Sequence, residues 1–204
     1  RELEGLPQQT GLLYGDVPDK VEMQENGVRF LVDVKNGQKT GFFLDQKENR
    51  AAIAPFVRGQ RVLDCFTHTG SFALHAGHYG AIEVTGVDIS DYACECAREN
   101  AALNGIGKDR YTVLTGDVLT DSALREKIEA KRYPIVTANI VASVIIALAP
   151  YAAKLLEEGG KFITSGIIDT REDEVAAALT AAGLNILEIR RGGDWRAILA
   201  EKRT

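Results

Sequence analysis

Two aspartates near the ends of apolar runs are the residues whose types and spacing point most clearly to chemistry. Asp64 belongs to the run RVLDC, and Asp88 belongs to the later run VTGVDI. A loop of mostly small residues, 66–71, follows the first run and opens a helical pattern. The N–H groups of such a loop and helix start attract a negative group, and an acid about 20 residues further on can bind both hydroxyls of a ribose. Asp64, Gly70 and Asp88 therefore predict a site for a cofactor that carries a nucleoside.

The loop itself argues against a dinucleotide cofactor. A pyrophosphate site favours G-x-G-x-x-G, because its glycines let the phosphates approach the backbone. Phe66 and His68 occupy the first two of these places, and only Gly70 remains. A nicotinamide oxidoreductase is therefore disfavoured, and the loop suits S-adenosylmethionine, which has no pyrophosphate. The alternative is that the unit only packs a strand against a helix.

Two further polar residues, Asp117 and Asn139, follow later apolar runs. At a strand tip, Asp117 can accept the amino hydrogens of an adenine; its alternative role is a helix N-cap, which Asp121 or Ser122 could fill instead. Asn139 lies at the C-terminal edge of the predicted sheet, where ligands of such sheets bind. Because its amide both donates and accepts, we predict that Asn139 holds the methyl acceptor or the amino-acid end of the cofactor. The alternative is a turn residue that bonds its own backbone.

The histidines and cysteines do not form a recognisable metal site. His75 and His78 lie three apart on a predicted helix without a third ligand, so we expect them at the surface or half-buried, and we expect His68 to shape its loop. An odd number of cysteines without metal-ligand spacing is typical of a reduced, cytoplasmic protein. The last two cysteines are expected to face different sides of a peripheral helix, away from any reaction. The three are Cys65, Cys94 and Cys96.

Length and composition fit one globular domain with a small appendage. The 204 residues are 45% hydrophobic and 26% charged, with a net charge of −5, which excludes a global basic field for RNA or a membrane surface. No apolar run reaches spanning length and no signal peptide is visible, so we expect no membrane partner. Because the histidines and cysteines lack metal-ligand spacing, we also expect no metal. The chain starts with Arg1, and we expect it to be part of a longer protein.

From residue 61 onward, strand and helix patterns alternate, which predicts an α/β, Rossmann-like parallel sheet covered on both faces. The expected strands are 61–65, 84–88, 111–115, 134–139 and 161–166. The expected helices are 71–79, 91–103, 121–131, 141–157 and 171–182. Gly192-Gly193 joins two last strands, 184–190 and 195–201, into an expected antiparallel hairpin.

Residues 1–44 predict a small β appendage, and residues 45–204 the cofactor-binding domain. Within the appendage, Asn26-Gly27 joins the runs 21–25 and 28–34 as a hairpin. The polar strip that follows is either a hairpin edge packed on the domain or a lid over the cofactor. Two aromatic residues in it, Phe42 and Phe43, look exposed.

A helix is expected directly after this strip. Asp45 and Glu48 have the spacing of a capping box, in which the first side chain caps the helix and the second reaches back. We predict a helix from Asp45 to about Val57.

The chain resembles two methyltransferase families. Residues 1 to about 105 resemble the RlmI-like rRNA methyltransferases, through RELEG, NGQKTGFFLDQKENR, VLDCFTHTGSFALHA and VTGVDIS. Residues from about 110 to 204 resemble the PrmA methyltransferases of a large-subunit ribosomal protein, through TANIVASVIIALAPYAAKLLEEGGKFITSGIIDTREDEV and GDWRAILAEK. Both resemblances imply the seven-stranded class I methyltransferase fold with S-adenosyl-L-methionine as cofactor. The joint near ARENAALNG indicates a natural or engineered hybrid.

The resemblance also implies which positions contact the cofactor. We expect a strip over the cofactor and a loop under its methionine part. We also expect an acid at the ribose with a neighbour at the adenine, a pair at the adenine edge and an asparagine at the reacting end. These positions are Lys39, Thr40 and Phe43; Asp64, Phe66, Thr67 and Gly70; Asp88 and Ile89; Asp117 and Val118; and Asn139.

The sequence departs from the RlmI-like pattern where the acceptor would bind. That family carries a cysteine after the fifth strand, and cytosine C5 needs a thiolate to add at C6. Here that strand ends in ITSGII, with Ser165 and no cysteine, whereas an amine nitrogen needs only deprotonation, alignment and a dry site. We expect methyl transfer to an amine nitrogen of a ribosomal protein, with Asn139 as the catalytic residue. The alternatives are rRNA cytosine C5 methylation and a hybrid that binds the cofactor without turnover.

Overall fold

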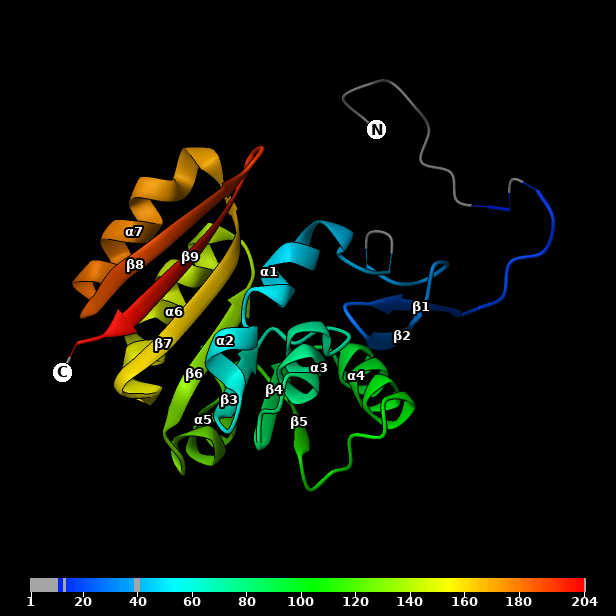
Figure 1. Cartoon of the computed structure of the whole chain (residues 1–204), viewed down its shortest axis with the longest axis horizontal. Coiled ribbons are helices and arrows are strands. Elements are labelled where there is room, and N and C mark those ends of the chain that lie inside the picture. Colours follow the sequence, from blue (N-terminus) through cyan, green and yellow to red (C-terminus); the bar gives the residue numbers. More distant parts are fainter. Residues whose placement is uncertain (1–10, 13, 39–40, 204) are drawn as a thin grey trace.

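The computed structural model describes residues 11–12, 14–38 and 41–203 of the chain. These residues form a seven-stranded sheet of order β5-β4-β3-β6-β7-β9-β8 and a separate two-stranded sheet, β1-β2. Helices cover both faces of the large sheet, and the small sheet lies beside it next to α4 (Figure 1). The predicted α/β, Rossmann-like class with seven strands is confirmed.

Five strands of the large sheet run parallel, as the alternating pattern predicted. They are β3 (Arg61–Cys65), β4 (Glu83–Asp88), β5 (Tyr111–Thr115), β6 (Tyr133–Asn139) and β7 (Leu156–Ile168). The helices between them are α3 (Ser71–His78), α4 (Asp91–Leu103), α5 (Ser122–Glu129) and α6 (Ala142–Leu155). Strand β7 starts earlier than the predicted residue 161, because its first residue, Leu156, pairs with Tyr133 of β6.

The sheet ends in the predicted antiparallel hairpin. After the 3-10 helix η3 (Asp169–Arg171) and α7 (Glu172–Ala181), the chain forms β8 (Leu184–Gly192) and β9 (Trp195–Lys202). Strand β9 lies between β7 and β8 and is antiparallel to both. The hairpin thus closes one edge of the sheet.

Alternation along the parallel strands divides the interior into two cores. Val62 and Val84 pack with α3, α4 and the small sheet on one face. Leu63 and Val87 pack on the other face with α5, α6 and α7. Because both faces are buried, each parallel strand reads as an almost continuous apolar run.

The N-terminal hairpin is held against α4 by side-chain amides. Strands β1 (Val21–Glu25) and β2 (Val28–Val32) pair antiparallel around Asn26-Gly27, as predicted. Asn100 Oδ1 accepts the N–H of Leu31 at 2.8 Å, and Asn104 Oδ1 accepts the N–H of Arg29 at 2.9 Å. Because residues four apart share one helix face, these two amides of α4 fix β2 alongside the helix.

The single helix predicted from Asp45 to Val57 is wrong. The chain instead forms the 3-10 helix η2 (Leu44–Gln46), α1 (Lys47–Ala51) and α2 (Ala54–Val57), and no side chain caps any of them. The carboxylate of Asp45 accepts from the Gln46 side chain instead of forming a capping box. Pro55 lies in the first turn of α2, where its missing N–H costs little, but it cannot donate to the carbonyl of Ala51 and so separates the two helices.

A buried ion pair joins the N-terminal hairpin to α1. Arg50 donates to both carboxylate oxygens of Glu25, through Nε at 2.6 Å and Nη2 at 2.9 Å, and the two residues are 0% and 4% exposed. The guanidinium also lies over the ring of Phe42, 4.6 Å from its centre. Phe42 is buried and Phe43 is half-buried, so the expectation that both are exposed is wrong.

His75 is also buried, contrary to the prediction of a surface or half-buried position. Its Nδ1 lies 2.7 Å from the carbonyl oxygen of Ser71, and its Nε2 lies 3.6 Å from Glu25 Oε1. Burial lowers the pKa of His75 to about 4. The ring is therefore neutral at neutral pH and serves as a packing element.

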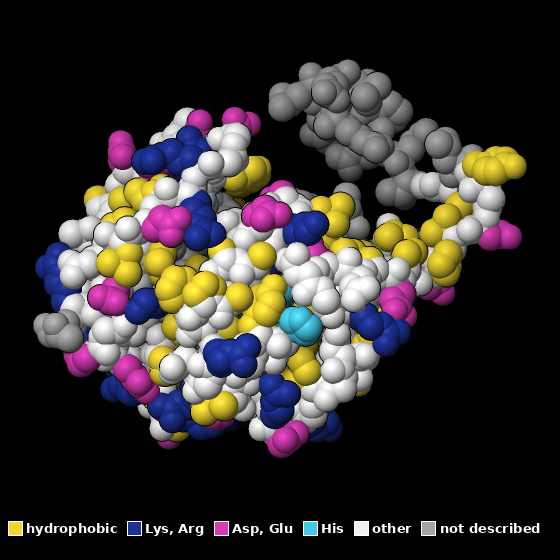
Figure 2. All heavy atoms as spheres, viewed as in Figure 1, with side chains coloured by type: hydrophobic (Ala, Val, Ile, Leu, Met, Phe, Trp, Pro, Cys, Tyr) yellow, Lys and Arg dark blue, Asp and Glu magenta, His cyan; other side chains and the backbone are white. Residues whose placement is uncertain are grey.

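On the face seen in Figure 2, basic and acidic side chains are interspersed, without a continuous basic field. No helix within the described ranges, 11–12, 14–38 and 41–203, is long and apolar enough to cross a membrane.

Candidate functional site

A cavity lies where the parallel strands end and faces the segment that follows β2. It encloses about 310 Å³. Five of the residues predicted to form the site line it: Phe43, Phe66, Asp88, Ile89 and Asn139. Four others, Asp64, Thr67, Gly70 and Val118, are not among its lining residues, and neither is Asp117. Lys39 and Thr40 lie outside the described residues.

Asp88 stands at the C-terminal end of β4 with both carboxylate oxygens directed by backbone groups. Oδ2 accepts the N–H of His68 at 2.9 Å, and Oδ1 accepts the N–H of Ser90 at 3.0 Å. A carboxylate oxygen has two lone pairs, so each oxygen keeps one for a ligand hydroxyl. Ile89 beside it is 68% exposed, an apolar surface suited to the flat face of a base.

The loop between β3 and α3 is held in an unusual backbone conformation. Phe66, His68 and Gly70 have φ values of 60°, 51° and 80°, in the left-handed region. Such a conformation costs on the order of 1–3 kcal/mol for a residue other than glycine and tends to occur at ligand sites. The N–H of Thr67 donates to the carbonyl of Val87 at 2.8 Å, which ties the loop to β4.

Asp64 supports this loop from beneath. Its Oδ2 accepts Thr67 Oγ1 at 2.7 Å and the N–H of Ala73 at 3.1 Å, and its Oδ1 accepts Thr137 Oγ1 at 2.7 Å. Burial raises the pKa of Asp64 to about 6, although these hydrogen bonds oppose the shift. The side chain is 2% exposed, so its geometry suits a support for the loop better than a direct ligand contact.

Asp117 forms a turn after β5. Its Oδ1 accepts the N–H of Leu119 at 2.9 Å, and its Oδ2 accepts Thr120 Oγ1 at 2.7 Å. The N-cap of α5 is Asp121, so Asp117 does not fill that role. Its predicted neighbour Val118 is 1% exposed and packs in the core. The adenine role of this pair remains a prediction.

Asn139 ends β6 and lines the cavity together with residues of the segment after β2. Its Cα pairs in register with that of Ser165 on β7, and Ser165 Oγ donates to Asn139 Oδ1 at 2.9 Å. The side chain thus bonds a neighbouring strand, whereas a simple turn residue would bond its own backbone.

The segment after β2 forms the outer wall and contains residues that the sequence did not single out. Asp33 Oδ1 accepts the N–H groups of Lys35 and Asn36 at 3.0 and 2.7 Å, which folds the segment into a turn. Its Oδ2 accepts the hydroxyl of Tyr92 on α4. The spacing Asp33 to Asn36-Gly37 is a turn signal, whereas nothing local marks Tyr92 as its partner.

A match to a known protein family covers the strand ends of this cavity but not the segment after β2. Residues 49–203 match the model of the family described as ribosomal protein L11 methyltransferase (PrmA), from α1 to the end of the large sheet. The chain belongs to this family. Its family and its fold are those of S-adenosylmethionine-dependent methyltransferases.

A second relationship covers the N-terminal part as well. The ribosomal RNA large subunit methyltransferase I of Shewanella amazonensis is 38% identical over an alignment of 210 positions, which covers 94% of this chain and 52% of the relative. The chain thus spans about half the length of this relative. The predicted double resemblance to RlmI-like and PrmA proteins is confirmed.

Solved structures agree with the PrmA relationship and with the fold. A ribosomal protein L11 methylase from Lactobacillus delbrueckii subsp. bulgaricus has a TM-score of 0.68 and 28% identity, over 78% of this chain and 80% of that one. A putative methyltransferase, SMU.776, complexed with SAH, has a TM-score of 0.81 and 19% identity, over 93% of this chain and 58% of that one. At that identity the second likeness shows the fold alone.

The cavity of the PrmA-type chain fits the S-adenosylmethionine of its family. Thr69 lines it, and Thr69 Oγ1 is buried without a hydrogen-bond partner among the described residues. A buried unpaired hydroxyl is costly, and a polar ligand in the cavity can pair with it. Together with the open lone pairs of Asp88 and the exposed Ile89, this wall offers contacts for a ribose, a base and a polar amino-acid end.

The cysteines are placed differently from the prediction. Cys94 and Cys96 are both buried, and Cys96 lines the cavity, so the expectation of a peripheral location is wrong for it. Burial raises the pKa of the Cys96 thiol and also that of the Cys65 thiol. Burial also lowers the pKa of His68, which stays neutral. Among the residues that the structure describes, no group of three His, Cys, Asp or Glu side chains is placed to hold a metal ion.

Proposed function

We propose that the chain transfers a methyl group from S-adenosylmethionine to an amine nitrogen of a ribosomal protein in the cytoplasm. One observation carries the choice of acceptor: the polar group at the end of β6 is the amide of Asn139, backed by the hydroxyl of Ser165. Cytosine C5 chemistry needs a thiolate close to the base, and an amine does not. The cofactor supplies an electrophilic methyl group on sulfur.

The chain's own residues would align the acceptor and exclude water from it. Asn139 Oδ1 can accept an N–H of the amine through its second lone pair, which directs the nitrogen lone pair elsewhere, toward the methyl group. The segment after β2 would exclude water, with Phe43 packed edge-on against His68 at 5.2 Å between ring centres. We assign residues 1–44 to the appendage and lid, and residues 45–204 to the cofactor-binding domain.

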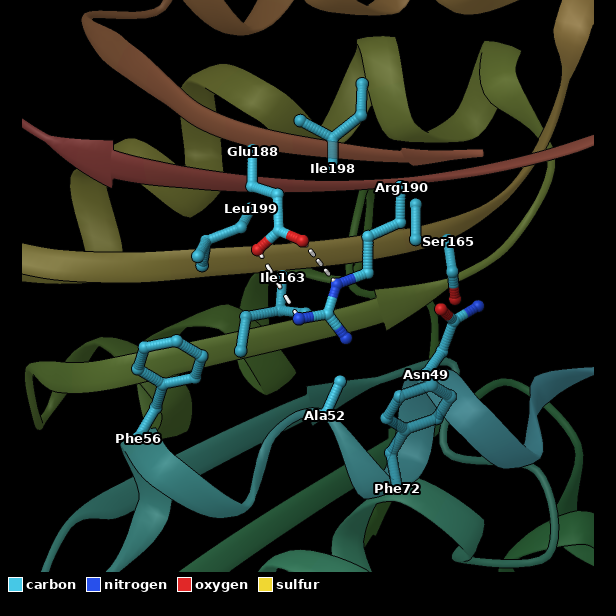
Figure 3. Close-up of a pocket in the computed structure, with 11 residues that line it drawn as sticks. Asn49, Ala52, Phe56, Phe72, Ile163, Ser165, Glu188, Arg190, Ile198 and Leu199 are labelled. Carbon is cyan, nitrogen blue, oxygen red and sulfur yellow. Dashed lines mark hydrogen bonds and ion pairs between the residues drawn. The ribbon is translucent and has the colours of Figure 1, made fainter. Parts of the chain in front are cut away.

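A narrow groove of about 30 Å³ lies beside the Ser165–Asn139 pair. It lies between α1, α2 and α3 on one side and β7, β8 and β9 on the other, with Phe56, Phe72 and Ile163 in its walls (Figure 3). Ser165 and Asn49 point toward one another at one end of this groove (Figure 3). A groove of this size has room for about one water molecule, so a hydrocarbon stem could enter it only if its walls moved apart.

Cytosine C5 methylation of rRNA is the second candidate. It is favoured by the relative from Shewanella amazonensis, whose name gives ribosomal RNA as its substrate. Cys96, which lines the cavity, is the thiol that this reaction would have to use, and burial raises its pKa. The raised pKa disfavours the thiolate form that would have to attack the base.

The test combines binding and transfer. Calorimetry with S-adenosylmethionine and S-adenosylhomocysteine measures cofactor binding first. Transfer of a radiolabelled methyl group is then measured on ribosomal protein and on naked rRNA. We expect the chain to bind both cofactor forms and the radiolabelled methyl group to appear in the ribosomal protein. Binding without label in either acceptor would support a hybrid without turnover, and label in rRNA alone would support the second candidate.

A further inference from the structure

Ser165 lies at the boundary between the two hollows of the molecule. It lines the groove of Figure 3, whereas its hydrogen-bond partner Asn139 lines the cofactor cavity. Ser165 is 2% exposed, so this bond is shielded from competing water. Its carbonyl also accepts the N–H of Ile140 at 3.1 Å, which fixes the backbone that follows Asn139.

The backbone around Ser165 is shaped to leave room for this bond. The pairing of β7 with β9 shifts register between Thr164 and Ile167, and Gly166 has a φ of 81°. A Cβ at Gly166 would lie 3.0 Å from Asn139 Oδ1 and 2.9 Å from the carbonyl oxygen of Ile140. Such bulges re-aim side chains next to active sites. The irregularity in β7 thus accommodates the Asn139 amide beside the Ser165 hydroxyl.

The orientation of the amide has a chemical consequence. With Ser165 donating to Oδ1, the oxygen is fixed in place with one lone pair left for an N–H of the acceptor. A flipped amide would present an N–H instead, and that group would bond to the lone pair with which the amine must attack. The orientation therefore decides whether Asn139 helps or blocks transfer.

We propose that Ser165 is a positioning residue, which fixes the amide of Asn139 in the orientation that an amine acceptor needs. The consequence for catalysis rests on the proposed function, whereas the fixed amide does not. Thr164 offers a matched control, because its hydroxyl is buried on the same strand without a hydrogen-bond partner among the described residues.

The first arm of the test needs no acceptor. Nitrogen-15 relaxation of the Asn139 side-chain amide, assigned by its loss in Asn139→Ala, reports its order in the intact chain. We expect a rigid amide in the wild type and in Thr164→Val, and an order parameter below about 0.6 in Ser165→Ala. An equally rigid amide in Ser165→Ala would overturn the proposal.

The second arm measures transfer with saturating cofactor. Ser165→Ala should lower kcat about tenfold, roughly the effect of one hydrogen bond, with unchanged cofactor affinity. The same substitution in an Asn139→Ala background should have no further effect, because Ser165 would act only through Asn139. Additive losses in the double variant would contradict the proposal. If the wild type methylates no acceptor, the proposed function fails, and the relaxation arm still decides the role of Ser165.

Discussion

At the scale of single residues, Asp88 has two tasks that the structure connects. Its Oδ2 accepts the N–H of His68 in the strained loop, and each carboxylate oxygen keeps a lone pair for a ligand in the cavity that Asp88 lines. A ribose bound to Asp88 would therefore also affect the loop, through the hydrogen bond between Asp88 and the N–H of His68. The spacing of about 20 residues between loop and acid suggests only the second of these tasks.

Replacing Asp88 by Ala should weaken S-adenosylmethionine binding by roughly 10- to 100-fold, since charge-assisted hydrogen bonds contribute about 1.5–3 kcal/mol each and water recovers part of the loss. Calorimetry measures the affinity, and circular dichroism checks that the fold is retained. Asp91→Ala is the matched control, because Asp91 is exposed at the start of α4 and does not line the cavity. Equal affinity in the wild type and Asp88→Ala would end the ribose assignment.

Two buried titrating residues should give the stability opposite pH dependences. Burial lowers the pKa of His75 from 6.5 to about 4, so the unfolded chain binds the proton first and stability falls as pH drops from about 6.5 to 4. Burial raises the pKa of Asp64 from 3.8 to about 6, so the folded chain keeps the proton and stability rises as pH drops from about 6 to 4. Each effect is on the order of 3 kcal/mol at most.

Urea unfolding of two variants separates these effects. Asp64→Asn retains the histidine effect, and its free energy of unfolding should fall between pH 7 and pH 4.5. His75→Gln retains the aspartate effect, and its free energy of unfolding should rise relative to the wild type over the same interval. Parallel pH curves for the two variants would show that these groups do not have the assigned pKa shifts.

At the scale of elements, the bond between Asp33 and Tyr92 joins the segment after β2, the proposed lid, to α4 in the lining of the cavity. The Tyr92 hydroxyl is the main cause that lowers the pKa of Asp33 to about 2, ahead of the backbone N–H of Asn36. Asp33 therefore remains a carboxylate acceptor at any physiological pH, and the bond is maintained.

Tyr92→Phe should loosen this lid without unfolding it. We expect cofactor affinity about 3- to 10-fold weaker, through faster dissociation, because one hydrogen bond is lost. Amide hydrogen exchange of residues 33–38 should also become faster. Tyr14→Phe is the control, since Tyr14 is 94% exposed. Unchanged dissociation and exchange in Tyr92→Phe would show that the bond does not hold the lid.

The elements that the sequence predicted well are those whose pattern is local. The parallel strands, their helices and both hairpins follow from periodicity and from Asn-Gly or Gly-Gly turns. The helix at 45–57 failed because Asp45 and Glu48 imitate a capping box, while Pro55 breaks the helix. The burial of Arg50 beside Glu25 was not predictable, because the partners lie 25 residues apart and only the tertiary fold joins them.

The candidate site shows the same division. Asp88 and Asn139 were predicted because each ends a parallel strand, and such ends meet at one edge of the sheet. The positions of Asp33 and Cys96 at the cavity depend on how the N-terminal hairpin packs against α4, which no spacing in the sequence encodes.

At the scale of the whole molecule, the relative named ribosomal RNA large subunit methyltransferase I aligns with 94% of the chain, and the PrmA model matches residues 49–203, so the two likenesses overlap. The N-terminal hairpin and the large sheet share one core, since the hairpin packs with α3, α4 and the strands on the same face. The edge of the sheet that presents Asn139 and Ser165 lies within the residues that the PrmA model matches. The central claim is therefore that methyl transfer goes to an amine and uses no cysteine.

The most direct test is the rate of methyl transfer to ribosomal protein, at saturating cofactor, for the wild type, for Asn139→Ala and for a variant with all three cysteines replaced by Ala or Ser. Cofactor affinity measured in parallel controls for packing changes at Cys65 and at Cys96 in the cavity wall. We predict that the cysteine-free variant retains most of its activity, and that Asn139→Ala loses more in rate than in cofactor affinity. Loss of activity in the cysteine-free variant with preserved fold and cofactor affinity, accompanied by wild-type labelling of rRNA, would contradict the claim and establish cytosine C5 chemistry instead.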